Sequence, residues 1–112
     1  MFAVIAGLTI TSIASASPVG GPQRTSGSLD PKQARVYTIE FRGEEKLTIT
    51  AEGTGSGDLD CYLFDNNEIL VSKDDDDTSI CIIKGTPKRT GKFHLMVKNS
   101  GEGDISFVVR AN

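Results

Sequence analysis

Carboxylates and cysteines gather in one stretch of the sequence, GDLDCYLFDNNEILVSKDDDDTSIC, which spans residues 57–81. Calcium takes about six to eight oxygen ligands, several of them carboxylates, from loops that wrap around the ion. Asp58 and Asp60 point to the same side of an expected strand, and an acidic run follows further along. The acidic run consists of Asp74, Asp75, Asp76 and Asp77. One hypothesis is therefore a calcium site that combines Asp58 or Asp60 with one or two members of this run.

The acidic run has a second interpretation that requires no metal. Four consecutive aspartates repel one another, so they are also typical of a hairpin loop that lies in solvent. Asp58 and Asp60 can equally accept hydrogen bonds from backbone amides of the neighbouring glycine-rich turn, residues 53–57. The linear EF-hand pattern is absent from the sequence. Both interpretations remain open at this point, and calcium is the only cofactor that the sequence suggests.

The two cysteines, Cys61 and Cys81, are the only ones in the chain. Residues 1–16, described below, have the pattern of a signal peptide and predict export. In a small exported protein, an even number of cysteines favours a disulfide over a metal pair or a catalytic thiol. Closing a loop of this length stabilises a protein by about 3 kcal/mol in the chain-entropy model. No CxxC motif is present, so a thioredoxin-type redox role has no support. We therefore predict a Cys61–Cys81 disulfide.

Three further side chains are candidates for function. Tyr62 and Phe64 share the strand face of Asp58 and Asp60, where they either line a binding strip for sugars or peptides or pack as partly buried residues. His94 is the only histidine, and no nucleophile or acid–base partner stands near it in the sequence. We therefore expect no catalytic residues and no enzymatic activity.

These residues must be positioned by β-strands, because apolar residues recur with a period of two along most of the chain. The alternating segments are 35–41, 45–52, 58–65, 68–72, 79–84, 92–98 and 104–110. Turn-forming residues separate the segments, and no apolar repeat of helical period is present. Without a crossover helix a parallel sheet is excluded. The sequence predicts an all-β fold, an antiparallel β-sandwich of about seven to eight strands.

The N-terminal part of the chain differs in composition from the rest. Residues 1–16 are uncharged, largely apolar and end in Ala14-Ser15-Ala16, which predicts a signal peptide with cleavage before Ser17. The apolar run is shorter than the roughly 20 residues of a membrane span. Residues 17–30 are rich in Pro, Gly and Ser and predict a flexible arm, so the folded domain is expected over 31–112.

The order of several motifs resembles the bacterial pre-peptidase C-terminal (PPC) family. The matching elements are Asp58-Leu59-Asp60, Tyr62, Asp65, the acidic loop 74–77 and the pattern TPxxTGxFxLxVxN over 86–99. The resemblance covers about residues 34–110 and implies a small jelly-roll-like β-sandwich of exported proteins, with calcium at its edge in some members. Glu68 stands where the family usually has glycine, and the last strand lacks the usual aromatic pair.

Charge and compartment limit the function. The formal net charge is −3 and the basic residues form no stripe, which argues against nucleic acid as a partner. We expect a secreted or periplasmic, non-catalytic binding or accessory module whose partner is an extracellular or envelope protein or polysaccharide. The alternative is a structural or chaperone-like aid to the folding or secretion of another exported protein.

Overall fold

A computed structural model describes residues 17–112, which form eight β-strands. The strands are β3 (Gln23–Leu29), β4 (Ala34–Phe41), β5 (Leu47–Gly55), β6 (Leu59–Phe64), β7 (Leu70–Asp74), β8 (Ile80–Gly85), β9 (Gly91–Asn99) and β10 (Ile105–Ala111). All seven segments that the alternating pattern predicted are strands. In the described part of the chain, no helix is long and apolar enough to cross a membrane.

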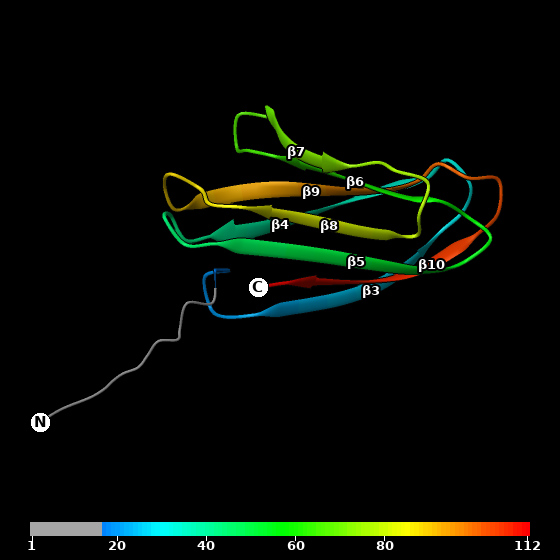
Figure 1. Cartoon of the computed structure of the whole chain (residues 1–112), viewed down its shortest axis with the longest axis horizontal. Helices are drawn as coiled ribbons and strands as arrows, with labels where there is room; N and C mark the ends of the chain where they lie inside the picture. The colour runs from blue at the N-terminus through cyan, green and yellow to red at the C-terminus, as the bar shows by residue number, and fades with distance from the viewer. Residues whose placement is uncertain (1–16) are drawn as a thin grey trace, which may run out of the picture.

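The strands form two four-stranded sheets that pack face to face (Figure 1). One sheet has the order β3-β10-β5-β8 and the other the order β4-β9-β6-β7. All strand pairs are antiparallel. Consecutive strands pass from one sheet to the other except at the β6–β7 hairpin. The predicted antiparallel β-sandwich is therefore confirmed.

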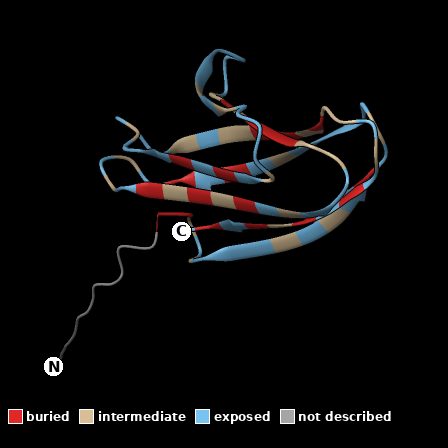
Figure 2. Ribbon diagram, turned by 45° about the vertical axis from the view of Figure 1, so that its right-hand side comes forward, coloured by how far each residue is buried: buried red, intermediate tan, exposed pale blue. Residues whose placement is uncertain are grey.

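The core forms between the sheets because the period-two pattern turns one face of each strand inward. In β5, for example, Leu47, Ile49 and Ala51 are buried, while the threonines between them are only half-buried (Figure 2). The fully enclosed side chains of the core come from both sheets and include Phe41, Ile49, Leu59, Ile83, Leu95, Val97 and Ile105.

The prediction of a flexible arm over residues 17–30 is wrong. Residues 23–29 form β3, which pairs with β10 from Leu29↔Ile105 to Gln23↔Ala111. Further upstream, Ser17 and Pro18 are buried, and Val19 N donates a hydrogen bond of 2.7 Å to the Glu40 carbonyl. The folded domain therefore includes residues 17–30. The predicted signal peptide, residues 1–16, lies outside the described residues.

Candidate functional site

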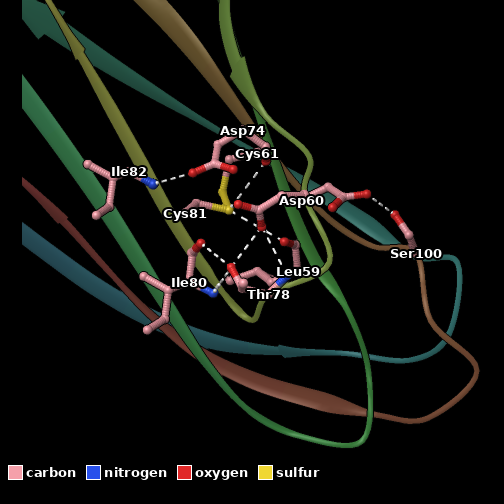
Figure 3. The surroundings of a disulfide bond; sticks show 10 residues. Leu59, Asp60, Cys61, Asp74, Thr78, Ile80, Cys81, Ile82 and Ser100 are labelled. Carbon is pink, nitrogen blue, oxygen red and sulfur yellow. Dashed lines mark hydrogen bonds between the residues drawn. A yellow bond between two sulfur atoms is a disulfide. The ribbon is translucent and has the colours of Figure 1, made fainter.

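The predicted disulfide between Cys61 and Cys81 is confirmed and joins the two sheets (Figure 3). Cys61 lies on β6 and Cys81 on β8, with their Cα atoms 6.2 Å apart. Both residues are buried in the core. Because β8 ends one sheet and β6 is next to the end of the other, the bond closes the sandwich along this side.

Asp74 makes a second link beside the disulfide. Its Oδ2 accepts a hydrogen bond of 2.8 Å from the backbone N–H of Ile82 (Figure 3). The two residues belong to β7 and β8, the edge strands of opposite sheets. An edge strand presents N–H groups that no neighbouring strand pairs. Asp74 therefore satisfies one such group.

The other members of the acidic run make mainly local contacts. Asp75 forms an ion pair of 3.1 Å with Lys73. Asp76 Oδ1 accepts hydrogen bonds from the backbone N–H of Thr78 at 2.9 Å and from its hydroxyl at 2.7 Å. These hydrogen bonds lower the pKa of Asp76. The loop is thus held mainly by contacts between residues that are close in the sequence.

Asp58 and Asp60 lie close to this loop and carry unpaired oxygens. Asp60 is only 7% exposed, and its Oδ2 accepts a hydrogen bond from the Ser100 hydroxyl (Figure 3). The Oδ1 atoms of Asp58 and Asp60 are buried without a hydrogen-bond partner. Burial, and then the negative charges of Asp60, Asp77 and Asp76, raise the pKa of Asp58. The structure therefore brings Asp58 and Asp60 within electrostatic range of the acidic run.

These carboxylates do not form a ready-made metal cage. Among residues 17–112, no group of three or more His, Cys, Asp or Glu side chains is placed to hold a metal ion. The buried carboxylate oxygens without a hydrogen-bond partner include those of Asp58 and Asp60, whereas Asp74 and Asp76 already accept hydrogen bonds. A calcium ion here would fit only if backbone carbonyls and water completed its ligands.

Asn99 organises this end of the sandwich, and sequence reasoning missed it. Its side chain is fully buried, and its Oδ1 accepts hydrogen bonds from the N–H groups of Asp58 (3.1 Å) and Gly101 (3.0 Å). Its Nδ2 donates to the carbonyls of Leu29 (3.2 Å) and Gly103 (2.7 Å). One side chain thus joins the segments that precede β4, β6 and β10. The only sequence signal is its position as the last residue of the TPxxTGxFxLxVxN pattern.

Tyr62 and Phe64 lie on the outer face of the β4-β9-β6-β7 sheet and are half-buried. One row across the sheet runs through Val36, Met96 and Tyr62 and ends at Lys73. The next row begins at Thr38 and runs through His94, Phe64 and Leu70. We call Val36, Tyr62, Phe64, Leu70, His94 and Met96 the outer strip. Cross-strand partners project from the same face, so their side chains form one continuous surface.

The outer strip is partly open to solvent. Val36 is 57% exposed and Leu70 46%, and the four residues between them are half-buried. His94 is held in place, with Nδ1 3.0 Å from Thr38 Oγ1 and Nε2 3.4 Å from Asn66 Oδ1. Burial and the Asp60 carboxylate raise the pKa of Tyr62, so its hydroxyl stays protonated at neutral pH. Sequence reasoning identified the two aromatic residues but missed Val36, Leu70 and Met96, which register alone brings to them.

The sequence matches no protein-family model and none of the curated proteins. Solved structures do share the fold. The pre-peptidase C-terminal domain of a collagenase from Bacillus anthracis is 16% identical, with a TM-score of 0.70 over 80% of this chain and 88% of that domain. PliG from Aeromonas hydrophila, a periplasmic inhibitor of g-type lysozyme, is 14% identical, with a TM-score of 0.61 over 90% of both chains.

A second inhibitor of the same kind, PliG from Salmonella Typhimurium, is 17% identical, with a TM-score of 0.54 over 81% of this chain and 86% of the inhibitor. At these identities the likeness is one of fold. The expected resemblance to the PPC family therefore holds at the level of the β-sandwich.

Proposed function

We propose that the protein is a non-catalytic binding module of an exported compartment that contacts another protein through the outer strip. The main support for this proposal is the outer strip, in which five apolar or aromatic residues and one histidine lie together on one face of the sheet. Large apolar side chains on a sheet face that is open to solvent are typical of interaction sites.

The composition of the strip favours a protein partner over a polysaccharide. Protein interfaces are enriched in aromatic residues and methionine, and depleted of charged residues at their centre. Tyr62, Phe64 and Met96 lie at the centre of the strip, and Val36 and Leu70 at its two ends. Methionine adapts to irregular apolar surfaces, which also suits contact with a protein.

Three observations support the exported compartment. The disulfide is typical of an oxidising environment. The N-terminal sequence has the pattern of a signal peptide. Two neighbours of the same fold are periplasmic and are named as inhibitors of a lysozyme, an activity that requires contact with a protein.

The test is capture of partners on the immobilised wild-type protein and on a Val36→Glu/Leu70→Glu variant. Both residues are well exposed, so the free energy of unfolding should change little. Burying an unpaired carboxylate in an interface should weaken binding at least about 100-fold. The matched control is Ile80→Glu/Ile82→Glu, which places the same charges on exposed positions of the other sheet.

A captured protein is then purified and its dissociation constant measured against all three proteins. Support requires that the purified pair binds, that the strip variant loses binding and that the control keeps it. Equal binding by the wild type and the strip variant would contradict the proposal. A glycan array tests the alternative of a polysaccharide ligand. Binding of a sugar by the wild type that the strip variant loses would identify the strip as a polysaccharide site.

Calcium is a second proposal, which rests on Asp58 and Asp60. Their buried, unpaired Oδ1 atoms are the atoms that a cation would satisfy at this end of the sandwich. In this proposal calcium stabilises the fold. Residues of the acidic run, Asp77 above all, supply further negative charge around the ion. Thermal unfolding with calcium and with a chelator tests it.

A further inference from the structure

A groove of about 630 Å³ opens at the end of the sandwich away from the acidic run. We call it the end groove. On one side it is lined by the β6–β7 hairpin, and on the other by β8, the β8–β9 loop and the start of β9. Its floor is apolar because Leu47, Leu63, Ile83 and Phe93 line it. The outer strip does not contribute to it.

The end groove exists because β7 and β8 diverge. The two strands are joined by the Asp74–Ile82 hydrogen bond at one end. The pairing of β6 with β7 then shifts between Leu63 and Phe64, which leaves Val71 as an extra residue in β7. Such a bulge bends a strand, and the β6–β7 hairpin rises away from β8 (Figures 1 and 2). Val71 lines the groove and is 49% exposed.

Both strands that flank the end groove are the edges of their sheets. Each edge carries backbone N–H and C=O groups that no neighbouring strand pairs. An extended peptide can add to such an edge through main-chain hydrogen bonds and place every second side chain in the groove. The geometry of the end groove therefore suits an extended segment rather than a compact ligand.

The rim of the end groove is positively charged although the protein as a whole is acidic. The four basic residues that line it are Lys84, Lys88, Arg89 and Lys92. All four are exposed, and within residues 17–112 none of them forms an ion pair. Asp65 also lines the groove, but its carboxylate accepts hydrogen bonds from the N–H groups of Asn67 (2.8 Å) and Ile69 (3.0 Å). The rim thus complements an anionic ligand.

From the apolar floor, the free strand edges and the basic rim, we infer that the end groove binds an extended acidic peptide segment of another protein. Apolar side chains at alternate positions of the segment contact the floor. Its carboxylates face Lys84, Lys88, Arg89 and Lys92. This site is separate from the outer strip, so binding at the end groove does not depend on binding at the strip.

The test uses a fluorescein-labelled octapeptide of alternating Glu and Val as the probe, with fluorescence anisotropy as the readout. The wild-type protein should bind it, and the Lys88→Glu/Arg89→Glu variant should bind at least about tenfold more weakly. The Arg24→Glu/Lys98→Glu variant is the matched control, because it changes the net charge equally at positions outside the groove. Its affinity should stay within about twofold of the wild type.

A second variant, Val71→Ser, tests the apolar contribution and should weaken binding of the peptide by about threefold to tenfold. Backbone amide NMR gives an independent readout, with the largest shifts expected along β7 and β8. Absence of binding by the wild type, or equal loss in both charge variants, would overturn the inference. Tighter binding of dextran sulfate that Val71→Ser leaves unchanged would also overturn it, in favour of a polysaccharide.

Discussion

At the scale of single residues, one buried side-chain amide, that of Asn99, connects several segments of the chain. Asn99 uses two donors and two acceptor positions to bond four backbone groups, which come from segments far apart in the sequence. Space around it is limited, since a Cβ on Gly101 would lie 2.8 Å from the backbone nitrogen of Asp58. Glycine at 101 is therefore required by close approach of two backbones.

We expect Asn99→Ala to lower the free energy of unfolding by about 3 kcal/mol, because four buried or partly buried backbone groups lose their partner. Denaturant unfolding followed by circular dichroism measures the change. Asn67→Ala is the matched control, since Asn67 is exposed and its side chain makes no hydrogen bond within residues 17–112. A loss below about 1 kcal/mol for Asn99→Ala would show that water replaces the amide.

Sequence reasoning reached some of these residues and missed others for a physical reason. The Cys61–Cys81 bond was predictable because only one pairing exists. The contacts of Asn99 were not, since they depend on how three segments distant in the sequence meet at one end of the sandwich. The acidic run looked uniform in the sequence, yet Asp74, Asp75 and Asp76 each have a different partner.

At the scale of elements, β3 is the one strand of the structure that the alternating apolar pattern did not predict. Its sequence, QRTSGSL, ends in its one buried residue, Leu29. Edge strands can be polar on both faces, because solvent covers one side and one edge of them. The seven predicted strands carried alternating apolar residues, whereas β3 is recognised only by its register with β10.

Two truncated proteins distinguish a strand from an arm. A chain that begins at Asp30 loses β3 and the burial of Leu29, so we expect its free energy of unfolding to fall by at least about 3 kcal/mol below that of a chain that begins at Gln23. Its melting temperature should be lower by roughly 4–8 °C per kcal/mol. Identical melting of the two chains would restore the flexible-arm interpretation.

At the scale of the whole molecule, two clusters of like-charged residues lie at different ends of the sandwich. The acidic run and Asp58 lie at the end where β7 leads into β8, and the basic rim of the end groove lies at the opposite end (Figure 1). Burial, and then repulsion from the carboxylates of Asp60, Asp77 and Asp76, raises the pKa of Asp58. The acidic end is therefore where a cation would affect stability most.

If calcium binds there, a concentration of about 100 times the dissociation constant raises the free energy of unfolding by about 2.7 kcal/mol. Thermal unfolding with calcium and with chelator measures it, and Asp58→Asn should remove most of the gain. Unchanged melting under both conditions would leave the acidic run as a solvated loop.

The pH dependence of the calcium-free protein has a definite sign. Because folding raises the pKa of Asp58, the folded state holds more protons just above the ordinary value of 3.8. The contribution of Asp58 to stability then falls as the pH rises through that window. Asp58→Asn should therefore stabilise the calcium-free protein at neutral pH and lose this advantage below the ordinary pKa. An advantage that does not change with pH would indicate another cause.

The disulfide also determines how the molecule responds to mechanical force. When the chain is pulled from its two ends, tension passes from Cys61 directly to Cys81, which are 20 positions apart. At about 3.3 Å per extended residue, roughly 60 Å of contour length stays slack inside the closed loop. That loop contains Tyr62, Phe64 and all of β7. A load that unravels the rest of the sandwich therefore leaves this part of the outer strip tethered in one covalent ring.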